Sequence, residues 1–115
     1  MQIIYESKSV EKYFTDVGLL SRAIGRDAAR ILIKRINALK AANNVDILLR
    51  TGLGKPHFLT GDLRGHIGIT LTGNYRLIVR PVTDDLTAES LKICNIICVK
   101  GVGDYHGSKN NWLIS

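Results

Sequence analysis

The fold is decided by residues 67–80, which read Ile-Gly-Ile-Thr-Leu-Thr-Gly-Asn-Tyr-Arg-Leu-Ile-Val-Arg. Up to the central Gly-Asn pair, large apolar residues alternate with small or polar ones, which is the period of a half-buried strand. Gly73 and Asn74 are typical of a two-residue hairpin turn, because both tolerate positive φ. The chain then returns as a second strand from Tyr75 to Arg80, and Pro81 ends it. The pattern predicts an antiparallel hairpin over residues 67–80.

On the C-terminal side of this hairpin lies a strongly apolar run, residues 93–102. It is apolar at both alternating sets of positions, which predicts a central strand covered on both faces. On the N-terminal side, a short strand at 2–6 is followed by helical periodicity, and the period becomes strand-like only after Gly54. This order predicts an α+β fold, in which the N-terminal strand and the helices pack on a mostly antiparallel sheet.

The helical region divides at turn-forming residues. Apolar residues at helical spacing predict a helix over residues 8–16, with Ser7 as its N-cap. Gly18 is expected to interrupt this helix, and Gly25 is a suitable C-cap for the short extension that follows. A second long helix is predicted over residues 27–42.

Length and charge bound the class of protein. The chain has 115 residues, which suits one domain with a modest core. Its net charge of +6 and pI near 9.6 favour a polyanionic partner, nucleic acid first, with an acidic protein or a membrane surface as alternatives. The apolar stretches are too short to span a bilayer, and Glu6 comes before any long apolar region, so we expect neither a membrane span nor a signal peptide. We therefore expect a cytoplasmic protein.

The cysteines and histidines do not form a metal-binding pattern. Cys94 and Cys98 are four residues apart, which is not the spacing of a zinc or thioredoxin motif. On a strand this spacing would place both thiols on one face, as free thiols in the core of a protein from a reducing compartment. His57, His66 and His106 add no paired ligand spacing, so we expect no metal and no cofactor.

Side chains suited to RNA chemistry gather at the hairpin mouth and after the apolar run. Cleavage of RNA needs a base for the 2′-OH proton, an acid for the leaving oxygen and cations at the phosphate. Arg76 could clamp a phosphate, Tyr105 could stack on a base, and His106 beside Asp104 could move a proton. Each residue also has a plainer interpretation. Asn74 would serve the turn, Arg76 would form an ion pair, and Tyr105 with His106 would serve packing and surface.

Two further basic segments are candidates for binding. Residues 55–65 combine Lys55, His57 and Arg64 with glycines, although the glycine pattern matches neither a Walker nor a dinucleotide-binding motif. The predicted second helix and the residues before it carry cations mostly at steps of four, which favours either a solvated face or contact with a polyanion or an acidic partner. This basic stripe consists of Arg22, Arg26, Arg30 and Lys34.

Three segments together resemble the HigB branch of the RelE/ParE toxin superfamily, the plasmid maintenance system killer proteins. They are LGKPHFLTGDLRG at 53–65, ITLTGNYRL at 69–77 and GDYHG at 103–107. The resemblance implies a RelE/ParE-like domain over residues 1–107, followed by a C-terminal tail over residues 108–115.

The resemblance also implies a function. It identifies the chain as the toxin of a type II toxin–antitoxin system, a ribosome-dependent mRNA endonuclease that needs no cofactor. A helix-turn-helix antitoxin would neutralise it, and operator DNA would be bound only through that complex. The implied site has two parts, catalytic and substrate-binding. The catalytic residues are His57, Asp104, Tyr105 and His106, and the substrate-binding residues are Asn74 and Arg76, to which we add the neighbouring cations Lys55 and Arg64.

The sequence departs from the family at one functional position. The catalytic lysine of the family aligns with Thr60, which cannot supply a cation to the transition state. Lys55 and Arg64 are the nearby cations that could serve instead. Two other hypotheses therefore stay open: a ParE-like poison of DNA gyrase, and a binding-only member that co-represses its operon with the antitoxin.

Overall fold

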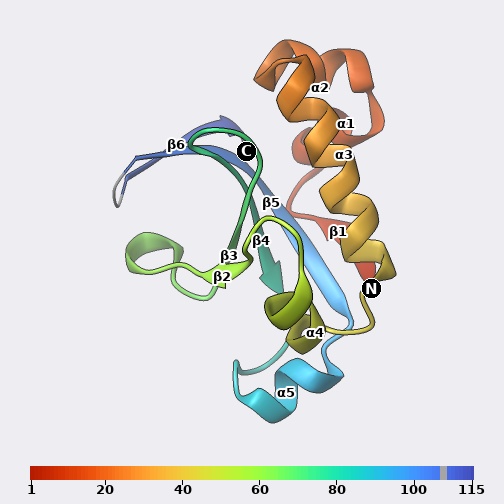
Figure 1. The fold of residues 1–115 in the computed structure, drawn as a ribbon, viewed down its shortest axis with the longest axis vertical. Helices are drawn as coiled ribbons and strands as arrows, with labels where there is room; N and C mark the ends of the chain where they lie inside the picture. Colours follow the sequence, from red (N-terminus) through yellow and green to blue (C-terminus); the bar gives the residue numbers. More distant parts are fainter. Residues whose placement is uncertain (107–108) are drawn as a thin grey trace.

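The computed structural model of the chain describes residues 1–106 and 109–115 (Figure 1). The N-terminal half is a strand followed by four helices, and the C-terminal half is mostly strands. In chain order the elements are β1 (Gln2–Tyr5), α1 (Lys8–Thr15), α2 (Val17–Ile24), α3 (Arg26–Ala41), α4 (Val45–Thr51), β2 (His57–Phe58), the short 3-10 helix η1 (Gly61–Leu63), β3 (Ile67–Thr70), β4 (Tyr75–Pro81), α5 (Ala88–Ile93), β5 (Ile96–His106) and β6 (Lys109–Ile114).

The strands form one mixed sheet in the order β1-β5-β4-β3-β2, and β6 also pairs with β5. Strand β1 runs parallel to the first part of β5, whereas β6 runs antiparallel to its last part. The predicted hairpin is confirmed, because β3 and β4 pair antiparallel across the turn. The remaining pairs, β2 with β3 and β4 with β5, are antiparallel too. The expected α+β fold with a mostly antiparallel sheet is therefore confirmed.

The hairpin turn differs from the prediction in two details. Only Gly73 has positive φ, at 52°, and Asn74 does not share this conformation. Thr70 lies opposite Arg76, and the Leu71 amide donates to the Tyr75 carbonyl at 2.9 Å, so the loop has three residues, 72–74, where two were expected. The Tyr75 amide donates to the Thr72 carbonyl at 2.8 Å, which closes the turn.

The helix boundaries follow the capping side chains. Ser7 caps α1 as expected, accepting a hydrogen bond from the Val10 amide. The next break comes at Asp16, whose carboxylate accepts from the Leu19 amide at 3.0 Å and begins α2. The expectation that Gly18 interrupts the helix was therefore wrong, because a strong N-cap ends one helix and starts the next before the glycine is reached. Gly25, at φ 88°, separates α2 from α3.

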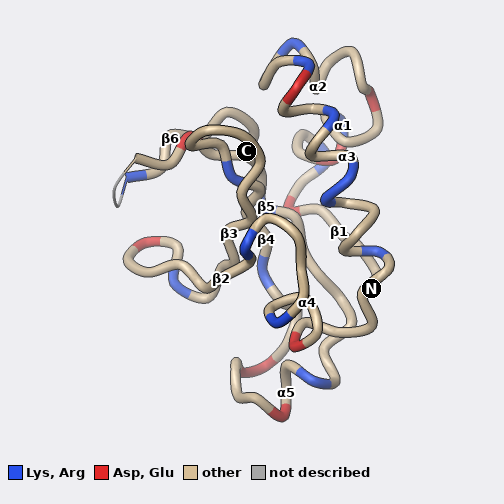
Figure 2. Tube along the Cα trace, in the orientation of Figure 1, with Lys and Arg blue, Asp and Glu red and all other residues tan. Residues whose placement is uncertain are grey.

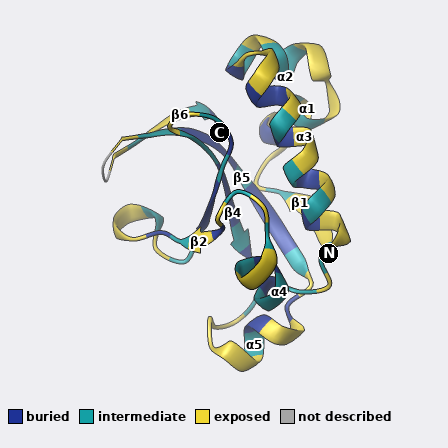
Figure 3. Cartoon of the chain, viewed as in Figure 1, coloured by how far each residue is buried: buried dark blue, intermediate teal, exposed yellow. Residues whose placement is uncertain are grey.

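One face of the sheet forms the core with the helices, and we call it the core face. Buried side chains of α3, among them Leu32 and Ile36, belong to one apolar cluster with Ile69 and Leu77 of the sheet. Figure 1 shows α1, α2 and α3 together on one side of the curved sheet, and Figure 3 shows the buried residues along α3 and the strands. The opposite face, which we call the open face, carries β2 and η1 at its rim.

The two cysteines do not share a face of one strand. Strand β5 begins only at Ile96, so Cys94 lies before it, at the end of α5, and packs in the core cluster. Cys98 lies on β5, and its thiol donates to Glu6 Oε2 at 3.3 Å. Both thiols are free and buried. The prediction of a shared face was wrong because a helical turn occupies the start of the apolar run.

The C-terminal residues contribute a strand where we expected a polar tail. Residues 109–114 form β6, which pairs with β5, and Ile114 is buried in the core cluster. The expected domain boundary, between residues 107 and 108, lies outside the described residues. This strand is stabilised by hydrogen bonds to backbone groups of β5 that would otherwise have no partner. The amino-acid pattern of residues 109–114 alone does not indicate this pairing.

Candidate functional site

A bulge in β5 decides which site residues share a face. Ile78 lies opposite Gly101 and Val79 lies opposite Val99, so Lys100 has no partner on β4. One extra residue on a strand reverses the facing of every side chain that follows it. After the bulge, Val102 lies in the core cluster, and by alternation Asp104 and His106 follow it onto the core face. Gly103 and Tyr105 consequently face the other way, onto the open face.

Arg76 and Tyr105 form the centre of the open face. Arg76 lies opposite Gly103, and its Cζ atom is 5.5 Å from the centroid of the Tyr105 ring, which is a cation–π contact. Its Nη1 donates to Thr70 Oγ1 at 2.8 Å. The Nε atom is buried and has no hydrogen-bond partner among the described residues. The guanidinium is therefore held in place while part of its donor capacity is unused.

His57 joins the same face from β2. It lies opposite Gly68, and a Cβ atom at Gly68 would be 3.4 Å from Arg76 Cδ, so the stem of Arg76 crosses this glycine. His57 Nδ1 is 2.9 Å from the carbonyl oxygen of Lys55. Because a carbonyl can only accept, Nδ1 carries the proton and Nε2 of the neutral ring is the bare nitrogen. His57 thus presents a proton acceptor two strands away from Arg76. Lys55 has φ of 53°, the left-handed backbone that directs its carbonyl to the ring.

His106, Asp104 and Asn74 form a second group at the end of the hairpin. Asn74 Nδ2 donates to His106 Nδ1 at 3.0 Å, and His106 Nε2 is 3.0 Å from Asp104 Oδ1. The neutral ring therefore carries its proton on Nε2 and donates it to the carboxylate. The Asn74 carbonyl also accepts from the Tyr105 amide at 2.8 Å, which ties the turn to β5. Both nitrogens of His106 are engaged, in contrast to those of His57.

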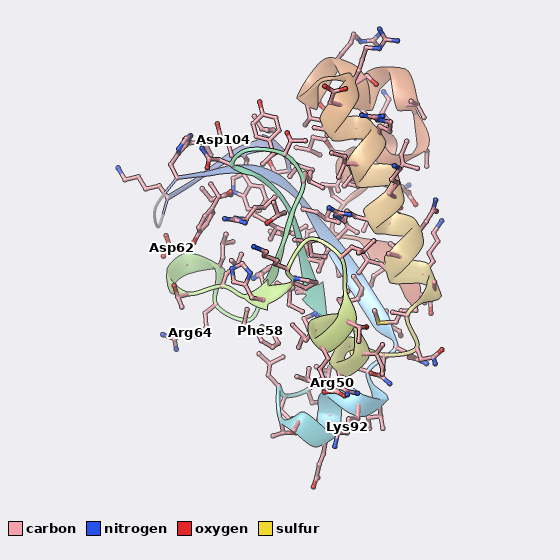
Figure 4. All side chains as sticks on the ribbon, in the orientation of Figure 1. Arg50, Phe58, Asp62, Arg64, Lys92 and Asp104 are labelled. Atoms are coloured by element: carbon pink, nitrogen blue, oxygen red, sulfur yellow. The ribbon has the colours of Figure 1, made fainter. Side chains whose placement is uncertain are left out.

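The structure thus places six of the eight predicted residues in two groups on opposite faces of the same end of the sheet. The open-face group is His57, Arg76 and Tyr105, and the other group is Asn74, Asp104 and His106. Lys55 adjoins the first group through its backbone carbonyl. In Figure 4, Arg64 projects from the loop after η1 away from the β5–β6 end, whereas Asp62 lies on the side toward it.

A cavity of about 270 Å³ adjoins Tyr105 on the open face. Thr60 and residues of η1 line one side of it, and Tyr105 of β5 with residues of β6 lines the other. Thr60, which the resemblance aligns with a catalytic lysine, lines this cavity. The residues that sequence reasoning missed are here too, and the isolated tryptophan in a polar C-terminal segment was the available signal. The lining comprises Thr60, Asp62, Leu63, Tyr105, Lys109, Asn110, Asn111 and Trp112.

A separate charged cluster occupies the other end of the open face. Glu6 Oε2 is 3.5 Å from Arg80 Nε, and Glu6 Oε1 is 3.5 Å from Lys100 Nζ. The hydrogen bond from the Cys98 thiol, supported by these two cations, lowers the pKa of Glu6. Burial, supported by that hydrogen bond, raises the pKa of Cys98. Arg80 therefore pairs with Glu6, whereas Arg76 on the same strand is available to the candidate site.

No three His, Cys, Asp or Glu side chains within residues 1–106 and 109–115 are grouped as a metal site would require. In that part of the chain, no helix combines the length and apolarity needed to cross a membrane.

Comparison with solved structures identifies the fold. The chain is similar to a YoeB/ParE toxin from Agrobacterium tumefaciens, with a TM-score of 0.54 and 18% identity over 92% of this chain and 100% of that one. It is also similar to chains in a YoeB-YefM complex and in a YoeB dimer, both from Staphylococcus aureus. Each has a TM-score of 0.51 and covers 93% of this chain and 98% of its own, at 17% and 16% identity respectively. No family model and no curated protein sequence matches the chain. The chain therefore has the α+β fold of the YoeB/ParE toxins.

Proposed function

We propose that this chain is the toxin of a type II toxin–antitoxin system and acts as a ribosome-dependent mRNA endonuclease in the cytoplasm. The observation that carries the proposal is the open-face group: a guanidinium held by Thr70 and Tyr105, with His57 beside it. The fold shared with YoeB/ParE toxins supports it, as does the net charge of +6. The resemblance of three segments to HigB-type toxins favours that branch.

We assign different roles to the two histidines from their hydrogen bonds. His57 Nε2 is the bare nitrogen, so it takes the proton from the 2′-OH of the RNA. Arg76 binds the scissile phosphate and stabilises the charge that develops there. The 2′-oxygen and the leaving 5′-oxygen belong to one phosphate, so the base and the acid must both lie within hydrogen-bond reach of it. His106 lies on the opposite face and donates its Nε2 proton to Asp104, so we assign it, with Asn74 and Asp104, to holding the end of the hairpin. The leaving 5′-oxygen takes its proton from a water molecule at the phosphate.

Induced expression with mapping of mRNA ends tests this proposal. Wild-type protein should arrest growth and produce new mRNA ends only on translating ribosomes. Arg76→Ala and His57→Ala should each lower the cleavage rate by about a hundredfold or more. Arg80→Ala is the matched control, because Arg80 is another arginine of β4 and is paired with Glu6 away from the site. Full toxicity of both Arg76→Ala and His57→Ala would refute the nuclease assignment.

The second candidate function is that of a toxin with the same fold that does not cleave RNA. Thr60 carries no charge, and the predicted catalytic residues are divided between two faces, so a toxin that acts by binding is the alternative. It would be a ParE-like poison of DNA gyrase, or a binding-only member that co-represses its operon. A supercoiling assay on the same induced cultures distinguishes the first from the nuclease, because only a gyrase poison changes plasmid topology. Unchanged topology and intact mRNA together would leave the binding-only member.

The antitoxin is proposed to cover the helical side of the molecule. Val17 on α2 and Ile33 on α3 are 60% and 40% exposed, and they line a hollow of about 330 Å³ with Arg26, Arg30 and Lys34. Figure 2 shows Lys and Arg recurring along α3. An apolar hollow with a cationic border suits an amphipathic, acidic segment of the antitoxin. Operator DNA would then be contacted only through the antitoxin, and a helix-turn-helix gene beside this one is the expected genomic context.

A further inference from the structure

The cavity beside Tyr105 is lined by side chains that phosphate binding and proton transfer do not use. Asp62 lines it, although a carboxylate repels a phosphate backbone and the chain as a whole is basic. Asp62 is exposed and forms no ion pair with the described residues, so its carboxylate oxygens are available to a ligand in the cavity. A carboxylate in an RNA-contacting surface is instead suited to accept hydrogen bonds from a base.

Two aromatic side chains line the same cavity. Tyr105 is half-buried and held by Arg76, and Trp112 on β6 is 37% exposed. Aromatic rings on an open sheet face are the surfaces on which single-stranded RNA bases stack. The cavity volume of about 270 Å³ provides room for a single base.

Asn110 forms part of the cavity wall, opposite Tyr105 on the neighbouring strand. Its amide lies against Gly103, and both amide atoms are buried. Asn110 therefore shapes the cavity, and recognition of a ligand falls to the other polar side chains of the lining.

We propose that this cavity binds one unstacked guanine base of the RNA. The base stacks on Tyr105 and Trp112, and its N1–H and N2–H donate to the two carboxylate oxygens of Asp62. Guanine is the base whose Watson–Crick edge presents two adjacent N–H donors, which is the pattern that a carboxylate accepts as a pair. Lys109, at the cavity edge, attracts the phosphate of the same nucleotide. This subsite rests on the proposed RNA-cleaving function, and it would make cleavage selective for guanine.

A binding assay tests the subsite without requiring cleavage. Trp112 is the only tryptophan of the chain, so fluorescence of the purified full-length protein reports directly on the cavity. GMP, AMP, CMP and UMP are titrated separately, with correction for absorbance by the nucleotide. We expect saturable quenching, with GMP bound at least about tenfold more tightly than the others, as for a good two-bond base contact. Asp62→Asn should remove this preference, whereas Asp84→Asn, the same charge change on an exposed loop residue, should leave it unchanged.

The outcomes separate the subsite from the proposed function. Equal affinities for the four nucleotides, the absence of any binding, or a GMP preference that survives in Asp62→Asn would each overturn the subsite. Mapping of mRNA ends is scored separately on the same variants. Cleavage that occurs without Asp62-dependent GMP binding would refute the subsite and leave the nuclease intact. Asp62-dependent GMP binding without any mRNA cleavage would support the subsite and refute the nuclease.

Discussion

Gly103→Ala should destabilise the end of the sheet that carries the candidate site. A Cβ atom at Gly103 would overlap Asn110 Oδ1 and lie 2.5 Å from Asn110 Cγ, so the amide must move. Overpacking of this kind costs about 1–3 kcal/mol, and the stiffer unfolded chain offsets about 0.4–1 kcal/mol of it. We therefore expect a net loss of roughly 0.5–2 kcal/mol in the free energy of unfolding, measured by urea titration.

A double-mutant cycle tests whether the contact with Asn110 is the cause. Asn110→Ala removes a side chain that forms no hydrogen bond within the described chain, so its own effect should be small. In that background, Gly103→Ala should cost almost nothing, giving a coupling energy above about 0.5 kcal/mol. Gly18→Ala is the matched control, because the nearest atom to its new Cβ would be 3.4 Å away. An equal cost of Gly103→Ala with and without Asn110 would refute the reasoning.

Three other predictions concern the site, the antitoxin and pH. Thr60→Lys should raise mRNA cleavage, because a cation beside Tyr105 would stabilise negative charge that develops only in the transition state. Mapping of mRNA ends measures this, and an unchanged cleavage rate would contradict it. Reversing Arg26 and Arg30 to Glu should slow antitoxin association and flatten its salt dependence in stopped-flow measurements, whereas Lys92→Glu on α5 should change neither. The lowered pKa of Glu6 means that its contribution to stability is present above the ordinary glutamate pKa and is lost as pH falls through the folded-state value. Urea titrations from neutral to acidic pH should therefore show a steeper loss of stability in wild type than in Glu6→Gln, and parallel curves would contradict this.

Much of the local structure could be predicted from the sequence, because it depends on signals between near neighbours. Alternation around Gly73 predicts the hairpin, and the Ser7 cap and apolar spacing predict α1. Arg76 and Tyr105 were each selected for their chemistry toward RNA, and the structure brings their side chains into contact. Their roles in cleavage stay a prediction.

The parts that failed depend on distant segments. The final residues carry only a short apolar triplet, 112–114, and their pairing as β6 requires the free edge of β5. The tryptophan in that triplet lines the cavity only because β6 returns beside Tyr105. The pattern within one segment can predict that it is a strand. It does not indicate which strand will pair with it, or which side chains will then lie side by side.

The sequence by itself determined the fold class, the basic character and the residue types of the candidate site, since these follow from periodicity, charge and local motifs. Tertiary structure alone decided how the site is divided. In a strand of strict alternation, Tyr105 would share a face with Val99, and His106 with Cys98. The unpaired Lys100 instead reverses this relation, so that Tyr105 meets Arg76 and His106 lies on the opposite face with Asp104. A single extra residue has this effect because strand side chains alternate with a period of two, and the sequence carries no mark of which residue its partner strand will skip.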